Sequence, residues 1–130
     1  MPESGVVDPP PEPTEWAFSV SEQIHASFDA GQFRRPVVSA WLNFYVQAHL
    51  SADAQRLLVV YQRRMLSNLK HTLRPLVQDR CGDDAAMLAA LIDGLYIRAA
   101  LGDGPVDPET SARAVFDLAE MLIAQPGREV

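Results

Sequence analysis

From Thr14 to Ala124, apolar residues recur every three or four positions, and this helical periodicity constrains the fold more than any other feature. Alternation of β-branched residues is absent, and glycines and prolines fall at intervals that suit helix ends. The first face carries Trp16, Val20, Ile24 and Phe28 at spacings of four. We therefore predict an all-α antiparallel bundle of about five helices.

Capping residues and breakers set the predicted helix boundaries. Thr14 caps a first helix that Gly31 ends, and Pro36 suits the first turn of a second helix reaching about Leu50. The third helix starts at a Ser51 cap, is kinked or ended by Pro75, and is interrupted at Gly82. Asp83 or Asp84 caps a fourth helix ending at Leu101, and Asp107-Pro108-Glu109 starts a fifth that ends near Ala124.

Domain organisation follows from the prolines. Residues 2–13 hold five of the ten prolines with three acids and no base, so we predict a disordered, proline-rich acidic tail over residues 1–13. Residues 14–125 form one helical domain, and residues 126–130 form a short C-terminal tail. A chain of 130 residues can bury one core and not two.

Composition excludes several classes of protein. The net charge of −6 argues against a chain that holds DNA by itself. The single thiol, Cys81, can form neither an intrachain disulfide nor a cysteine-based zinc site, and it fits a reducing, cytoplasmic setting. The longest uncharged stretch, residues 36–52, is too short and too polar for a membrane span. The start of the sequence has no secretory signal.

No catalytic or metal-binding pattern is found. His25, His49 and His71 lack metal-ligand spacing, Cys81 has no adjacent histidine, and there is no glycine-rich phosphate loop. We therefore expect no enzyme activity, no metal and no cofactor.

The second helix is apolar on almost every side. Its neutral polar residues Ser39, Asn43 and Gln47 share one line. Such a helix must be covered on most sides, so we expect it to be central. The polar line suits either a lined cavity or an ordinary core helix with satisfied polar groups.

The fourth and fifth helices carry more apolar surface than one small core needs, which favours a two-fold seam between subunits. In the fourth helix, Gly94 suggests close backbone packing and Asp93 needs a partner.

Residues 51–80 carry a net charge of +4, against −10 for the remainder. Arg56, Arg63, Lys70 and Arg74 lie on one helical line, which indicates either a contact with an acidic partner or a solvated face.

Aromatic residues are spread over the first four helices, with Glu22, Asp29 and Asp93 among them. If they meet, ring faces and a carboxylate suit a cationic ligand of the quaternary-ammonium type, whereas a plain aromatic core is the alternative. The candidate pocket residues are Phe28, Trp41, Phe44, Tyr45, Tyr61, Asp93 and Tyr96.

Three ordered blocks carry a family resemblance: FDAGQFRRPVVSAWLNFY at residues 28–45, YQRRMLSNL at residues 61–69 and LAALIDGLYIRAALGDGPVD at residues 88–107. Together they resemble the C-terminal regulatory domain of TetR-type repressors, nearest to the choline-responsive BetI type. The resemblance implies an all-α domain that dimerises through its last two helices and holds an effector pocket near Trp41, Phe44, Tyr45 and Tyr61. At or near the seam it implies Leu91, Leu95, Arg98, Val115, Phe116, Leu118, Ala119 and Leu122.

The resemblance does not extend to DNA recognition. Such repressors begin with a helix-turn-helix domain, and no basic recognition helix can be drawn in this sequence. We expect a homodimeric effector-binding domain of a BetI-like regulator without its own DNA-binding domain, which binds a small cationic or apolar effector and contacts neither DNA nor membrane. The alternative is a stand-alone interaction protein that pairs with a full-length repressor of this type.

Overall fold

The computed structural model describes residues 13–29, 33–102 and 107–125, which form five α-helices and one short 3₁₀ turn. The helices are α1 (Pro13–Ser27), α2 (Arg35–Gln47), α3 (Ala52–Val77), α4 (Cys81–Leu101) and α5 (Pro108–Ala124), with the turn η1 (Gln78–Arg80) between α3 and α4. The described residues contain no strand, and the all-α prediction is confirmed. Of the tail predicted at residues 1–13, Pro13 lies in α1, so the helix starts before the predicted Thr14 cap; residues 1–12, the tail at residues 126–130 and the Gly31 stop lie outside the described residues.

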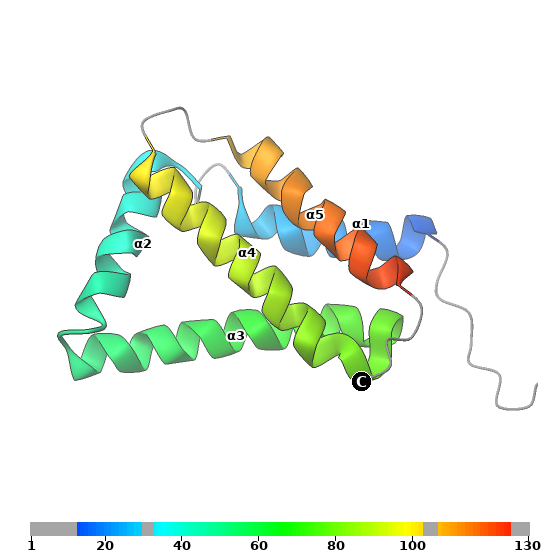
Figure 1. Cartoon of the computed structure of the whole chain (residues 1–130), viewed down its shortest axis with the longest axis horizontal. Coiled ribbons are helices and arrows are strands. Elements are labelled where there is room, and N and C mark those ends of the chain that lie inside the picture. The colour runs from blue at the N-terminus through cyan, green and yellow to red at the C-terminus, as the bar shows by residue number, and fades with distance from the viewer. Residues whose placement is uncertain (1–12, 30–32, 103–106, 126–130) are drawn as a thin grey trace, which may run out of the picture.

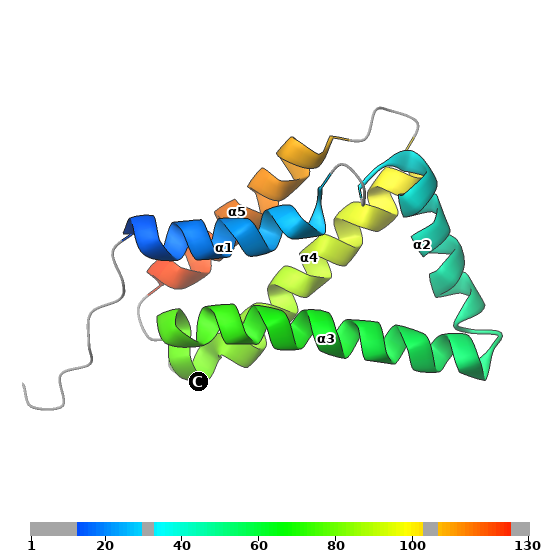
Figure 2. The same ribbon diagram turned by 180° about the vertical axis from the view of Figure 1, so that it is seen from behind.

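Three helices follow the sides of a triangle (Figure 1). α3 and α4 meet at η1 and diverge from it, and α2 runs along the open side. α5 and α4 lie toward the viewer in Figure 1, whereas α1 and α3 are in front in the reverse view of Figure 2. Because α4 packs against α2, α3 and α5, it is the central helix.

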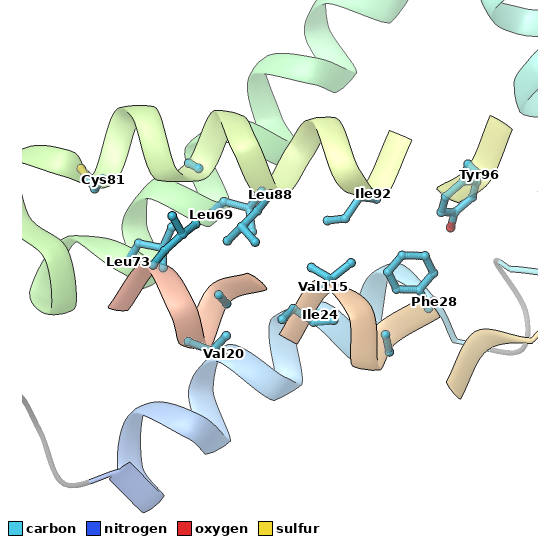
Figure 3. Packing of buried hydrophobic residues seen from close by; sticks show 14 of the residues in the cluster. Val20, Ile24, Phe28, Leu69, Leu73, Cys81, Leu88, Ile92, Tyr96 and Val115 are labelled. Atoms are coloured by element: carbon cyan, nitrogen blue, oxygen red, sulfur yellow. The ribbon is translucent and has the colours of Figure 1, made fainter. Parts of the chain in front are cut away.

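The core lies where α1, α3, α4 and α5 meet, as Figure 3 shows. Each helix presents residues at spacings of three or four, which is how a helix stripe buries apolar surface. The labelled residues are Val20, Ile24 and Phe28 of α1, Leu69 and Leu73 of α3, Cys81, Leu88, Ile92 and Tyr96 of α4, and Val115 of α5. Burial of these side chains supplies the main favourable term for folding.

The expectation that residues 36–50 form the central helix is wrong. Within α2, Val38 is buried, whereas Val46 is 52% exposed. Asn43 and Gln47 are exposed and Ser39 is partly buried, so most of the neutral polar line faces solvent. α2 lies at an edge of the molecule, where one face packs on α4 and α3 and the other stays open.

Two predicted caps are confirmed. Ser51 accepts a hydrogen bond from the Ala54 amide at 3.3 Å. Asp107 accepts from the amides of Glu109 at 3.1 Å and Thr110 at 3.4 Å, with Pro108 in the first turn. These bonds, together with one from the Thr110 hydroxyl, hold the pKa of Asp107 below its ordinary value.

The break between α3 and α4 differs from the prediction. α3 continues past Pro75 to Val77, and the chain turns at Gln78, whose φ of 52° is unusual for a residue with a side chain. After η1, α4 starts at Cys81, so Gly82 lies inside a helix and Asp83 and Asp84 are not its caps. The positive φ of Gln78 turns the chain between the two helices, so no break is needed at Gly82, which lies within α4.

Arg35 joins the start of α2 to the end of α4. Its guanidinium donates to the carbonyl of Ala99 at 2.7 Å and to that of Gly102 at 2.6 Å. The last carbonyls of a helix lack partners within it and carry partial negative charge, so a cation there is doubly favourable. This bond pair closes the third corner of the triangle.

Candidate functional site

Aromatic side chains from α2 and α3 meet on the inner side of α2. The rings of Trp41 and Tyr61 are 4.4 Å apart between centroids, and Tyr45 lies 6.1 Å from Trp41. Trp41 and Tyr45 are one helical turn apart on α2, which places both rings on the same face. The sequence prediction that Trp41, Tyr45 and Tyr61 come together therefore agrees with the packing.

A cavity of about 240 Å³ lies beside these rings. Trp41, Tyr61 and Tyr96 are the predicted pocket residues that line it. The rest of its lining was not predicted: Gln23, Ala26 and Ser27 from α1, and Arg64, Met65 and Asn68 from α3. The cavity is therefore bounded by four helices and lined by both aromatic rings and polar side chains.

Asp93 of α4 lies next to the tyrosines. The Tyr45 hydroxyl donates a hydrogen bond to its carboxylate at 3.3 Å, so Asp93 has the partner that its apolar surroundings demand. Burial raises the pKa of Asp93, and the hydrogen bond from Tyr45 opposes that rise. Burial and the charge of Asp93 raise the pKa values of Tyr45 and Tyr61, so both hydroxyls stay neutral near neutral pH.

Tyr96 connects the cavity to the core. Its hydroxyl donates to the carbonyl of Ser27, and burial is the main cause of its raised pKa. Its ring packs 5.0 Å from Phe33 and 5.8 Å from Phe28 between centroids. Phe28 is buried, makes an edge contact with Phe33 and is not among the residues that line the cavity. It packs against the ring of Tyr96, which does line the cavity.

Phe44 also lies outside this cavity. It contacts Trp41 at 5.6 Å between centroids and lies at a second, apolar hollow on α2, which Trp41 also lines together with Pro36, Val37 and Ala40. The assignments of Phe28 and Phe44 to the pocket wall are therefore corrected, since one fills the core and the other turns to the outer side of α2.

The predicted seam residues fall into two groups. Val115, Ala119 and Leu122 are buried in the chain's own core, so they lie behind the surface of α5 and are not available to a second copy. Partly buried against that core are Leu91, Leu95, Phe116 and Leu118, while Arg98 is exposed. The most exposed apolar residues of these helices, Met87, Leu101 and Met121, were not predicted as seam residues.

The basic row of α3 faces solvent at three of its four positions. Arg56 pairs with Asp53, a neighbour on the same helix, and Arg63 and Arg74 are exposed. Lys70 is half-buried beside Leu66 and His71 in a shallow hollow. A solvated helix face accounts for this row.

Neither a metal centre nor a membrane span is found in the part of the chain that the structure describes. There, no three side chains of His, Cys, Asp or Glu come together as metal ligands. None of the described helices is both long and apolar enough to cross a membrane.

Residues 19–124 match the family model described as the C-terminal domain of BetI-type transcriptional repressors. The HTH-type transcriptional regulator BetI of Agrobacterium fabrum is 43% identical over 108 residues, which is 80% of this chain and 51% of that protein. The corresponding values for BetI of Rhizobium meliloti are 45% identity over 102 residues, 75% and 49%.

The chain thus spans about half the length of the curated relatives it matches. No solved structure matches it. The family model covers most of the chain, and the relatives are named as transcriptional regulators and not as enzymes. The cavity, its rings and Asp93 all lie within the matched residues, and this chain belongs to the BetI-type C-terminal domains of the TetR family of transcriptional regulators.

Proposed function

We propose that this chain is the effector-binding and dimerisation domain of a BetI-like regulator, acting in the cytoplasm. The observation that carries the proposal is the cavity of about 240 Å³ lined by the rings of Trp41, Tyr61 and Tyr96, with Asp93 next to Tyr61. Ligand pockets of drug-sized molecules measure roughly 300–1,000 Å³, so this one suits a smaller effector.

The side chains that line the cavity favour binding of a ligand with a cationic group. The face of an aromatic ring carries partial negative charge and attracts a cation within about 6 Å of its centroid. Trp41 is the strongest ring of this kind, and its contact with Tyr61 gives two adjacent rings. Asp93 adds a negative charge that neither ring neutralises, so a quaternary ammonium group is the favoured effector group.

Calorimetric titration with choline tests the effector proposal. We expect binding of choline, and weaker binding, by at least about tenfold, of its neutral carbon isostere, because the isostere keeps the shape and loses the charge. Trp41→Leu should abolish the difference between the two ligands. Phe18→Leu, which changes an exposed aromatic residue outside the cavity, is the matched control and should leave it intact. Equal binding of both ligands by the wild-type chain would contradict a cation site.

Dimerisation is proposed for the surface of α4 and α5. Met87, Gly94 and Leu101 follow one line of α4 at spacings of seven, and Met121 of α5 is exposed. Both helices lie toward the same side of the molecule (Figure 1). A side-chain carbon added at Gly94 would meet nothing within 4 Å in the monomer, so close approach of a second copy would explain a glycine there.

We assign no DNA contact to these five helices. The chain carries a net charge of −6, and its basic row on α3 is offset by acidic residues elsewhere. A phosphate backbone attracts surfaces with an excess of Lys and Arg, and this chain has the opposite balance.

A further inference from the structure

Arg64 is the one guanidinium among the residues that line the cavity. It follows Tyr61 by three positions on α3, so the two side chains leave the helix on the same face. Within residues 13–29, 33–102 and 107–125, Arg64 forms no hydrogen bond or ion pair, in contrast to Arg56, which pairs with Asp53. Its charge is therefore available at the cavity.

The positive charge of the Arg64 guanidinium lowers the affinity of the cavity for a ligand that carries only positive charge. The same side chain favours a ligand with a carboxylate, because guanidinium and carboxylate form charge-assisted hydrogen bonds. The cavity thus offers two kinds of electrostatic partner: the rings of Trp41 and Tyr61 with Asp93 near Tyr61, and the guanidinium of Arg64.

Amide groups add donors to the wall that carries Arg64. Asn68 lies four positions after Arg64 on α3 and also lines the cavity. Gln23 of α1 uses its side-chain carbonyl to accept from the Thr72 hydroxyl at 3.3 Å, which leaves its NH₂ group to donate. Donors from two helices therefore line the cavity, and a carboxylate could accept from them.

We propose that the cavity selects a small zwitterion, whose quaternary ammonium group lies against Trp41 and Tyr61 and whose carboxylate binds Arg64. The inference rests on the proposed effector site and adds a specificity-determining residue and a ligand class to it. It separates this site from one that accepts a cation by its rings alone, since Arg64 discriminates between ligands that share the same ammonium group.

Three probes with the same trimethylammonium group test the proposal: glycine betaine, which is a zwitterion, and its methyl ester and choline, which are cations. Affinities are measured by calorimetric titration of the whole chain. We expect glycine betaine to bind the wild-type chain more tightly than its methyl ester by about fivefold, the scale of a partly exposed ion pair. Arg64→Gln should remove this preference, and Arg64→Lys should restore part of it.

The matched control is Arg63→Gln. Arg63 is the preceding residue on α3, has the same side chain and does not line the cavity, so its substitution changes the net charge equally and should leave the preference unchanged. Thermal unfolding of each variant without ligand shows whether it is folded.

The outcomes separate the two proposals. Binding of choline or the methyl ester as tight as that of glycine betaine overturns the zwitterion proposal and leaves the effector site intact. An equal loss of all three affinities in Arg64→Gln also overturns it, because Arg64 would then only support the wall. Absence of binding by all three probes to the wild-type chain contradicts both proposals.

Discussion

The hydroxyl of Tyr45 connects the aromatic cluster of α2 to the carboxylate of α4. It is the donor that partners Asp93, which lies half-buried among tyrosines. A carboxylate in such a place is stable only when a donor compensates for lost water. The charge that would attract a cation thus depends on a residue of another helix.

Asp93 should make the stability of the fold depend on pH. Burial raises the native pKa of the Asp93 carboxyl above its ordinary value of 3.8, so the folded chain binds the proton more tightly than the unfolded chain does. Stability from this residue is therefore fully present below pH 3.8 and is lost as pH rises through the native pKa.

Asp93→Asn should consequently raise the free energy of unfolding near neutral pH and change it little near pH 4. The gain should stay below about 1 kcal/mol, because the half-exposed carboxylate is screened by solvent. Urea unfolding of both proteins between about pH 4 and about pH 7 measures it. A difference that is the same at both ends of this range would exclude Asp93 as its source.

Arg35→Ala should destabilise the fold by about 1–2 kcal/mol, because two charge-assisted hydrogen bonds to the end of α4 are lost. Arg34→Ala is the matched control, since the neighbouring side chain is exposed, and should cost less than about 0.5 kcal/mol. Urea unfolding compares the two variants. Equal costs for both would show that the contact with α4 contributes nothing.

At this scale the sequence predicted the aromatic half of the site and missed the polar half. Trp41, Tyr61 and Asp93 stand out because large rings and a lone acid are rare on apolar faces. Gln23 and Ser27 become cavity residues through the packing of α1 against α3, which local patterns do not contain. The spacing of Arg64 and Asn68 from Tyr61 was a usable signal, because all three share one helix face.

At the scale of helices, boundaries with a side-chain cap were predictable and the α3–α4 break was not. Ser51 and Asp107 cap their helices through hydrogen bonds to amides at most three residues away. Such local contacts can be predicted from the sequence alone. Gln78 adopts its positive φ because the packing of α3 against α4 demands a reversal there, and no glycine marks the place.

Gln78→Gly should therefore stabilise the fold by about 0.5–1 kcal/mol. The backbone conformation of Gln78, with φ of 52° and ψ of −116°, is sparsely populated and costs a residue with a Cβ about 1–3 kcal/mol, and the extra freedom of glycine in the unfolded chain offsets part of the gain. Gln78→Ala keeps the Cβ and is the control, for which no gain is expected. Chemical unfolding of the three proteins tests this; a loss of stability in Gln78→Gly would mean that the φ of 52° is not strained.

Helix α2 shows why the apolar content of a helix does not by itself predict a central position in the fold. Its sequence is apolar nearly all round, yet Val46 is exposed, and Phe44 lies with Trp41 at an apolar hollow on the helix in addition to the cavity that Trp41 lines. A helix at the edge of a small domain can carry such a surface when it lines a ligand cavity or meets another chain.

At the scale of the whole molecule, the outer side of α4 and α5 is the surface that the dimer proposal needs. Leu101 is 72% exposed and Met121 is 68% exposed. Large apolar side chains that gather on one face of a monomer mark an interaction site more often than single ones do.

Met121→Glu should shift the chain to a monomer, because an unpaired charge would be buried in the seam. Leu50→Glu is the matched control, since Leu50 is 77% exposed but follows α2, away from α4 and α5. We expect the Met121 variant to weaken self-association at least about tenfold and the Leu50 variant to leave it unchanged, as measured by sedimentation over a concentration series. A wild-type chain that sediments as a monomer at every concentration contradicts the seam.

The bond pair of Arg35 also has a consequence for the order of folding. Arg35 and Ala99 are 64 residues apart, and bringing together ends at that separation costs about 3–4 kcal/mol in chain entropy. α3 and α4, joined by a three-residue turn, can pair at far lower entropic cost. We therefore expect the hairpin of α3 and α4 to form before the corner between α2 and α4 closes, so the bond pair of Arg35 should stabilise the native state more than it speeds folding.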